Sequence, residues 1–223
     1  MQMEGDFRIR LSSIEATEVT RELSAVMAEF PERICPHLHV CLQSGSDAIL
    51  RRMKRRWSAQ LFVDRCQLVR ETLDEPAFTT DVIVGFPGET DADFEQTMTL
   101  LEDVRFDGSF SFKYSPRPGT PALRMEPEAV SAEVASARLK RFQDRQRELQ
   151  MESNKAMEGQ VHDILVEGRS KWEEDVACGR TGTFKMVNFP GSLDLVGSTV
   201  PVRILRGFSN SLRGEMLAAP HGP

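Results

Sequence analysis

The feature that most constrains the fold is a regular alternation of strand and helix patterns over the first 115 residues. In the first strand pattern, Phe7, Ile9 and Leu11 alternate with polar residues. The further strand candidates are residues 37–42 (HLHVCL), 78–84 (FTTDVIV) and 110–114 (FSFKY). Helices are expected between these strands, at residues 19–30, around 49–53, at 58–73 and after a capping box at Thr90 and Asp93. Strands that alternate with helices pair in parallel, so the sequence predicts an α/β fold with a parallel sheet.

Polar residues follow or interrupt these strands where a ligand would bind. In parallel sheets, ligands bind at the carboxyl ends of the strands. Asp81 lies inside an apolar run, where a carboxylate is costly unless it faces the open end or has a partner. Other polar residues are placed near strand ends: Glu15 comes after RLSS, Gln43 follows HLHVCL, and Arg55 lies in the basic segment RRMKRR. Two carboxylates, a carboxamide and a guanidinium suit a ligand that carries hydroxyls, an amine and a carboxylate.

The third strand ends in the turn GFPGE, residues 85–89. Gly85 and Gly88 allow a sharp turn, and their lack of a side chain lets the backbone approach a flat ligand closely. A tight strand-to-helix turn without a ligand explains the same residues equally well. Both interpretations stay open from the sequence.

Composition and charge limit the function classes. The net charge of -6 argues against nucleic-acid binding by bulk electrostatics, although it leaves room for a local basic surface. There is no apolar run of about 18 residues and no signal-peptide pattern at the start, so we predict a cytoplasmic protein without a membrane span.

The four cysteines show no metal-site spacing. Neither CxxC nor CxxxCxxC occurs, so no metal site is predicted. Cys66 lies on the apolar face of a predicted helix and is expected to be a buried thiol. Cys35 and Cys41 are expected to be a loop and a strand thiol without a role.

The remaining residues predict a second domain. Residues 1–125 are assigned to the α/β domain and residues 126–157 to a long charged connecting helix, with Ala135, Leu139, Phe142 and Leu149 as its inner stripe. Residues 158–219 contain several short strand patterns separated by turns, which are typical of a small antiparallel β-barrel.

The second domain also carries basic and aromatic residues that could contact RNA. Arg180, Lys185 and Arg213 are among seven basic residues that could share one side of the barrel, where they would meet phosphates. Alternatively, the charges only solubilise the domain. Phe184, Phe189 and Phe208 are expected mainly in the core.

Four segments identify a family. RLSSIEATEVT, HLHVCLQSGSDAILRRMKRR, TTDVIVGFPGETDADFEQT and FSFKYSPRPGTPA, in that order, resemble the later strands of the radical S-adenosylmethionine (β/α)6 partial barrel of tRNA methylthiotransferases. GRTGTFKMVNFPGSLDLVG and NSLRGEML resemble the TRAM domain of those enzymes. FDGSFSFKYSPRPGTPA and VNFPG are most similar to the MiaB-type branch, the tRNA 2-methylthio-isopentenyladenosine synthases. RLSSIEATEVT and CPHLHV are equally similar to the branch that modifies threonylcarbamoyladenosine.

The resemblance implies a reaction and a set of roles. In that family a reduced 4Fe-4S cluster cleaves S-adenosylmethionine, and the 5'-deoxyadenosyl radical leads to a methylthio group on carbon 2 of an adenosine beside the anticodon of tRNA. The family positions that contact S-adenosylmethionine match Glu15, Gln43, Arg55 and Asp81. Gly85 and Gly88 would shape the backbone that packs against the adenine. The turns that hold Arg180 and Arg213 match the TRAM pattern and are expected to contact the anticodon stem-loop, together with Lys185.

The sequence also departs from the family. The cluster-ligating cysteines, including those of CxxxCxxC, are absent, and the chain starts at what resembles the third barrel strand. We therefore expect the carboxyl-terminal portion of a longer enzyme, inactive by itself and monomeric. The alternative is a non-catalytic RNA-binding protein that uses its TRAM domain. A nucleotide-binding domain of another type has no support, because GxGxxG and GxxxxGK[ST] are absent.

Overall fold

The structure is a computed structural model that describes residues 7–171, 173 and 175–217. The ends of the predicted domains at residues 1–6 and 218–219 lie outside the described residues. By compactness the chain divides into two units, Met1–Gln146 and Arg147–Pro223. The domain boundaries after residues 125 and 157 stay predictions.

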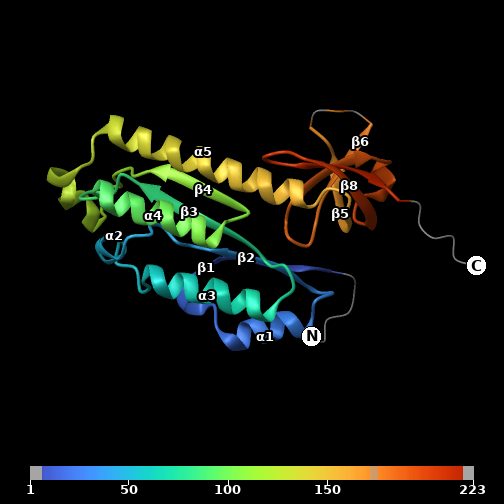
Figure 1. Cartoon of the computed structure of the whole chain (residues 1–223), viewed down its shortest axis with the longest axis horizontal. Coiled ribbons are helices and arrows are strands. Elements are labelled where there is room, and N and C mark those ends of the chain that lie inside the picture. The colour runs from blue at the N-terminus through green and yellow to red at the C-terminus, as the bar shows by residue number, and fades with distance from the viewer. Residues whose placement is uncertain (1–6, 172, 174, 218–223) are drawn as a thin grey trace, which may run out of the picture. The chain divides into compact units, whose positions relative to one another are not determined.

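The first unit contains the predicted parallel sheet (Figure 1). Its four strands lie in the order β1-β2-β3-β4, and each neighbouring pair is parallel. Their bounds are β1 Ile9–Ile14, β2 Ile34–Val40, β3 Ala77–Val84 and β4 Gly108–Lys113. The α/β prediction is confirmed, and all four carboxyl ends lie at the same edge of the sheet.

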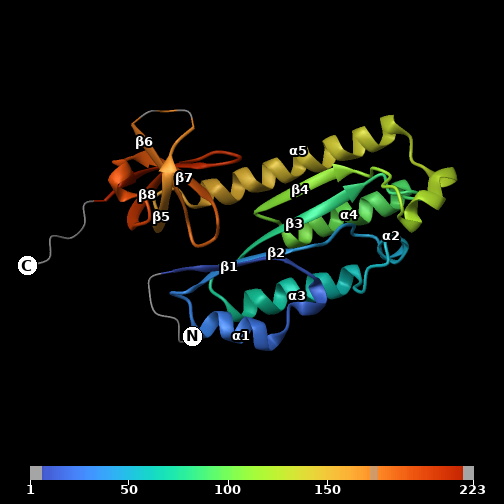
Figure 2. The same ribbon diagram turned by 180° about the vertical axis from the view of Figure 1, so that it is seen from behind.

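Helices connect the strands, as the sequence predicts. They are α1 Arg21–Glu29, α2 Asp47–Arg52, α3 Ala59–Thr72 and α4 Asp91–Val104, with the short 3-10 helix η1 Ala16–Glu18 after β1. The capping box at Thr90 and Asp93 is confirmed: each side chain bonds the backbone N–H of the other residue. Contacts join α1 to α3 and α3 to α4, and α1 and α3 lie beside one another in both views (Figure 2).

The two faces of the sheet differ in burial. The side chains of Leu38, Val82 and Val84 point to one face of the sheet, and each of these residues is at most 1% exposed. On the opposite face the exposure rises from β2 to β4: His39 is 5% exposed, Asp81 is partly exposed, and Phe110 and Phe112 are 61% and 57% exposed. Because successive strand residues point to opposite faces, His39, Thr79 and Asp81 share this open face with the two phenylalanines, whereas Thr80 points to the buried face.

The connecting segment differs from the single helix predicted for residues 126–157. Pro121–Glu128 forms a 3-10 helix, η2, that contains Pro127, and helix α5 spans Ala132–Ala156. Proline lacks the N–H that a continuous α-helix needs, so the chain starts a new helix, whose Val134 N–H donates to the Ser131 hydroxyl. In the predicted inner stripe, Ala135, Phe142 and Leu149 are buried, whereas Leu139 is half-buried.

The second unit contains a closed five-stranded barrel, as the sequence predicts. The strands follow the order β5-β6-β7-β9-β8 and surround an apolar core that includes Ile164, Phe189 and Val202. The β7–β9 pair is parallel, while the other four pairings are antiparallel. The bounds are β5 Val161–Arg169, β6 Val176–Arg180, β7 Met186–Pro190, the 3-10 helix η3 Leu193–Leu195, β8 Thr199–Gly207 and β9 Leu212–Met216.

Candidate functional site

Backbone hydrogen bonds bring the ends of β1, β2 and β3 together. The Cys41 N–H donates to the Ile14 carbonyl at 3.0 Å, which places the residue after β2 beside the end of β1. Gln43 then bridges to β3, because its N–H donates to the Asp81 carbonyl at 2.8 Å and its carbonyl accepts from Ile83 at 2.9 Å. Gln43 is 7% exposed and has a φ of 74°, which non-glycine residues rarely adopt.

Asp81 lies on the open face of the sheet, where it meets two side chains of β2 and its extension. The His39 Nε2 atom lies 3.3 Å from the Asp81 Oδ2 atom, and the Cys41 thiol donates to the same oxygen at 3.6 Å. The partner that the sequence demanded for the Asp81 carboxylate therefore exists. His39 is a residue of this site that sequence reasoning missed.

Glu15 and Arg55 also lie near this group. Burial raises the pKa of the Cys41 thiol to about 11, and the charges of Asp81 and Glu15 raise it further, whereas the charge of Arg55 lowers it. Charge interactions of this kind act over short distances. Gln43 is bridged to Asp81, Glu15 directly follows Ile14, which bonds Cys41, and the charge of Arg55 acts on the same thiol.

Several arginines of the basic segment RRMKRR, residues 51–56, contact other side chains. Glu15 pairs with Arg56, whose Nε atom donates to the Glu15 Oε2 atom at 3.1 Å. The Arg55 guanidinium lies over the Trp57 ring at 5.5 Å, and its buried Nε has no hydrogen-bond partner among the described residues. Arg52 pairs with Glu128 at 2.9 Å. Arg52 and Arg56 thus have acidic partners within the protein.

The GFPGE turn is closed by its own carboxylate. The Gly85 N–H donates to the Glu89 Oε2 atom at 2.7 Å, and Arg138 of α5 donates to the same oxygen at 2.7 Å. Burial raises the pKa of Glu89, although both hydrogen bonds oppose this shift. The side chains of Glu89 and Arg138 are 1% and 8% exposed. Glu89 therefore has a structural role that the sequence did not indicate.

Both glycines of the turn are required by its conformation. Gly85 and Gly88 have φ values of 71° and 80°. A Cβ at Gly85 would lie 2.7 Å from the Cβ of Ala135, and one at Gly88 would lie 3.0 Å from the Arg52 guanidinium carbon. The turn thus needs both glycines for its own packing, whatever it binds.

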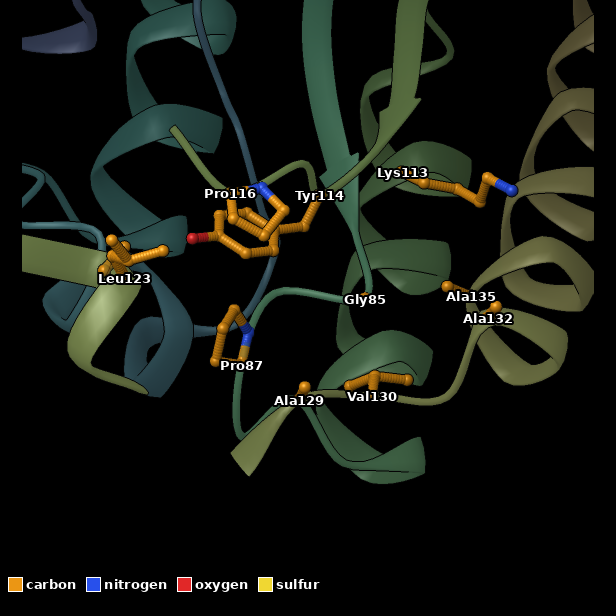
Figure 3. A pocket seen from close by; sticks show the side chains of 11 residues that line it. Gly85, Pro87, Lys113, Tyr114, Pro116, Leu123, Ala129, Val130, Ala132 and Ala135 are labelled. Carbon is orange, nitrogen blue, oxygen red and sulfur yellow. The ribbon is translucent and has the colours of Figure 1, made fainter. Parts of the chain in front are cut away.

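A cavity of about 270 Å³ lies beside this turn (Figure 3). Its lining combines the loops after β3 and β4 with η2 and the start of α5, and it is mostly apolar: Gly85, Pro87, Pro116, Leu123 and Val130 contribute. The Tyr114 hydroxyl points towards Leu123 and has no hydrogen-bond partner among the described residues. The loops after β3 and β4, at the carboxyl ends of the strands where a ligand is expected, therefore line the same cavity.

The cysteines do not assemble a cluster site in the described part of the chain. The one group there of at least three possible metal ligands is His39, Cys41 and Asp81, which contains a single thiol. Cys66 is 2% exposed, so the prediction of a buried thiol is confirmed, and burial raises its pKa to about 12. A 4Fe-4S cluster, which needs three or four thiolates, does not fit these residues.

In the barrel, the three basic residues expected to contact RNA all have partners within the protein. Arg180 pairs with Glu167 at 3.2 Å and lies 3.9 Å over the Phe184 ring. The Lys185 ammonium donates to Asn154 and Ser153 at 2.9 and 3.0 Å, and Arg213 forms two hydrogen bonds with Glu173.

Of the three phenylalanines expected in the barrel core, Phe189 is buried and Phe184 is half-buried. Phe208 is 38% exposed, and the Arg206 guanidinium lies 5.2 Å from its ring centre. The core prediction is therefore wrong for Phe208. Strand β8 ends at Gly207, and Phe208 follows it in a turn, where the in-and-out alternation of a strand no longer applies.

Comparison with known proteins assigns both parts of the chain. The family model of the Radical SAM superfamily matches residues 3–101, and that of the TRAM domain matches residues 155–217. The first part of the chain is therefore similar to the Radical SAM superfamily, and the last part is similar to the TRAM domain. Within the described residues, no helix is long and apolar enough to cross a membrane.

The curated relatives point to one type of enzyme. The tRNA-2-methylthio-N(6)-dimethylallyladenosine synthase of Carboxydothermus hydrogenoformans is 41% identical over 216 residues, which are 97% of this chain and 49% of the relative. The enzyme of the same name from Syntrophobacter fumaroxidans is 42% identical over 96% of this chain and 46% of the relative. The chain thus spans about half the length of these relatives.

A solved structure supports the fold. Coproporphyrinogen III oxidase from Escherichia coli, described as a Radical SAM enzyme, aligns with a TM-score of 0.53 at 12% identity, covering 94% of this chain and 51% of that one. The prediction of a radical S-adenosylmethionine partial barrel followed by a small barrel is confirmed.

Proposed function

We propose that this chain is the part of a tRNA methylthiotransferase that contacts S-adenosylmethionine and tRNA during methylthiolation of dimethylallyladenosine, also called isopentenyladenosine, beside the anticodon. The similarity to synthases of that name over nearly the whole chain supports the reaction class. The observation that carries the proposal is the convergence of Glu15, Gln43, Arg55 and Asp81 at one edge of the sheet.

Each of these residues suits a different group of S-adenosylmethionine. The carboxylates of Asp81 and Glu15 would accept hydrogen bonds from ribose hydroxyls or from the ammonium group. Arg55, whose buried Nε lacks a partner among the described residues, would donate to the carboxylate, and the Gln43 side chain would do either. We propose that Gly85 and Gly88 shape the turn against which the adenine packs.

When bound in the family's manner, S-adenosylmethionine and a 4Fe-4S cluster supply radical chemistry. The described residues of this chain provide binding groups for the first and no set of thiolates for the second. The contribution of this chain is therefore to position the cofactor and the tRNA. We expect it to act in the cytoplasm as a single chain.

We propose that the barrel holds the anticodon stem-loop through Arg180, Lys185 and Arg213. Two of these side chains pair with carboxylates that are 41% and 46% exposed, Glu167 and Glu173. Exposed ion pairs are weak, so a phosphate can replace the carboxylate at small cost. The Arg180 guanidinium already stacks on an aromatic ring, an arrangement that a neighbouring base can extend.

A chimaera tests the proposal. The amino-terminal half of the Carboxydothermus hydrogenoformans synthase is fused to this chain and expressed in cells that lack their own methylthiotransferase. Mass spectrometry of tRNA nucleosides should detect the methylthio group on dimethylallyladenosine, and Asp81→Asn should abolish it. The matched control Asp64→Asn, on exposed α3, should retain activity. A soluble, cluster-loaded chimaera that leaves tRNA unmodified contradicts the proposal.

A further inference from the structure

His39, Cys41 and Asp81 offer three donor atoms of different kinds that all lie within 4.8 Å of one another. We propose that these three side chains form a binding site for a zinc-type divalent cation, with one coordination position left for water or another ligand. The spacing of cysteines along the sequence did not indicate such a site, because Cys41 and Asp81 are 40 residues apart and meet only through strand pairing.

The two distances to the Asp81 Oδ2 atom match those between ligands of a tetrahedral ion, and the His39 and Cys41 donor atoms lie within 4.8 Å of each other. With bonds of about 2.0 Å to nitrogen and oxygen and about 2.3 Å to sulfur, tetrahedral geometry separates nitrogen from oxygen by roughly 3.3 Å and sulfur from oxygen by roughly 3.5 Å. The His39 Nε2 and Cys41 Sγ atoms lie 3.3 and 3.6 Å from the Asp81 Oδ2 atom. A hydrogen bond between nitrogen and oxygen is usually shorter, at about 2.9 Å.

A second contact orients the histidine as a metal ligand. The His39 Nδ1 atom lies 3.0 Å from the Thr79 hydroxyl, which also lies 3.1 Å from the His37 Nε2 atom. When Thr79 donates its single proton to His37, it accepts from the His39 Nδ1–H. The lone pair of His39 Nε2 then faces the Asp81 carboxylate, and a cation between them resolves the repulsion. Ligating histidines commonly donate their other N–H in this way.

The surroundings suit an open site with three protein ligands. His39 and Asp81 lie on paired strands, which hold both rigidly, because His39 is directly opposite Thr79 in the β2–β3 register. The Asp81 side chain is 30% exposed, so a fourth ligand can reach the ion. The ring of Phe110 lies 5.9 Å from that of His39 and shields one side of the group.

Zinc binding does not depend on the proposed function, but the two share Asp81. An ion that takes the Asp81 carboxylate withdraws it from S-adenosylmethionine, so the two ligands should compete. This predicts that zinc inhibits cofactor binding at the sheet edge and that a chelator restores it.

The full 223-residue chain, stripped by a chelator, is titrated with Zn²⁺ by calorimetry and with Co²⁺ by absorbance, since a thiolate ligand to cobalt gives a charge-transfer band. We expect one ion per chain. Cys41→Ser and Asp81→Asn should each weaken binding by about 100-fold or more, and Thr79→Val by about 10-fold. Cys178→Ser, which removes a thiol of the barrel, is the matched control and should bind like the wild type.

Folding of each variant is checked by the fluorescence of Trp57, which is 4% exposed and whose indole N–H lies 3.4 Å from the Leu42 carbonyl beside the site. Absence of saturable binding by the wild type overturns the proposal, as does equal affinity in folded Cys41→Ser. Retained S-adenosylmethionine binding in such a case refutes only the zinc site. Loss of cofactor binding with intact zinc binding refutes only the proposed function.

Discussion

The ion pair between Glu89 and Arg138 should contribute strongly to the stability of the first unit. The Glu89 carboxylate is 1% exposed and accepts from Arg138 at 2.7 Å. In Arg138→Met the carboxylate stays buried without its cation, which costs about 3–5 kcal/mol. Arg141→Met is the matched control on the same helix, since its partner Glu95 is 54% exposed, and its effect should be small by comparison.

Urea unfolding followed by Trp57 fluorescence measures this cost. The chain has two tryptophans, so the experiment uses a Trp172→Phe background in which Trp57 reports on the first unit alone. The midpoint of Arg138→Met should fall far below that of Arg141→Met. Adding Glu89→Gln to Arg138→Met should recover part of the loss, because the second change removes the unpaired charge.

The loss of stability in Arg138→Met should depend on pH. Burial holds the pKa of Glu89 above its usual value, and removal of Arg138 should raise it further. A raised pKa in the folded state means that the stability contributed by Glu89 is complete below its unfolded pKa and is lost as the pH rises through the folded value. The penalty of Arg138→Met should therefore be larger at pH 8 than at pH 5. Equal destabilisation by Arg138→Met and Arg141→Met would refute the reasoning.

Two further predictions concern the turn and the thiol. Gly85→Ala should destabilise the first unit by about 2–4 kcal/mol, because Gly85 has a positive φ and its Cβ would lie close to the Ala135 Cβ. Gly119→Ala is the control: Gly119 also has a positive φ, but no atom lies near its Cβ, so the change should cost about 1 kcal/mol in the same urea assay. In chelated protein at pH 8, iodoacetamide should alkylate Cys41 roughly 100-fold more slowly than an ordinary thiol, because its pKa is about 11. Mass spectrometry should show faster alkylation in Asp81→Asn, and an unchanged rate there would argue against the charge effect.

The sheet was predictable because its signals are local. Strand alternation and helical spacing are read within a few residues, and they identified all four strands of the first unit. The rule that ligands bind at the carboxyl ends of parallel strands then selected Glu15, Gln43, Arg55 and Asp81. Backbone hydrogen bonds at the end of β2 join Gln43 to Asp81 and bring the end of β1, which Glu15 follows, beside Cys41.

The missed residues depend on contacts between distant segments. His39 lies on β2 and Cys41 follows that strand two residues later, which places both on one face, but only the pairing with β3 places them beside Asp81. The pairing of Glu15 with Arg56 depends on how the loop after α2 returns to the sheet. The parallel β7–β9 pair likewise follows from barrel closure, which no local pattern encodes.

The central claim is that the sheet edge around Asp81 binds S-adenosylmethionine. NMR chemical-shift mapping of the isotope-labelled chain, freed of metal by a chelator, tests this binding at millimolar S-adenosylmethionine. The variant Arg56→Ala is measured in parallel, because it releases Glu15 from its ion pair. We expect weak, saturable binding that perturbs the amides around Glu15, Gln43 and Asp81. This binding should be lost in Asp81→Asn and should be tighter in Arg56→Ala. Saturable shifts confined to other elements, or none in the wild type and Arg56→Ala, would contradict it.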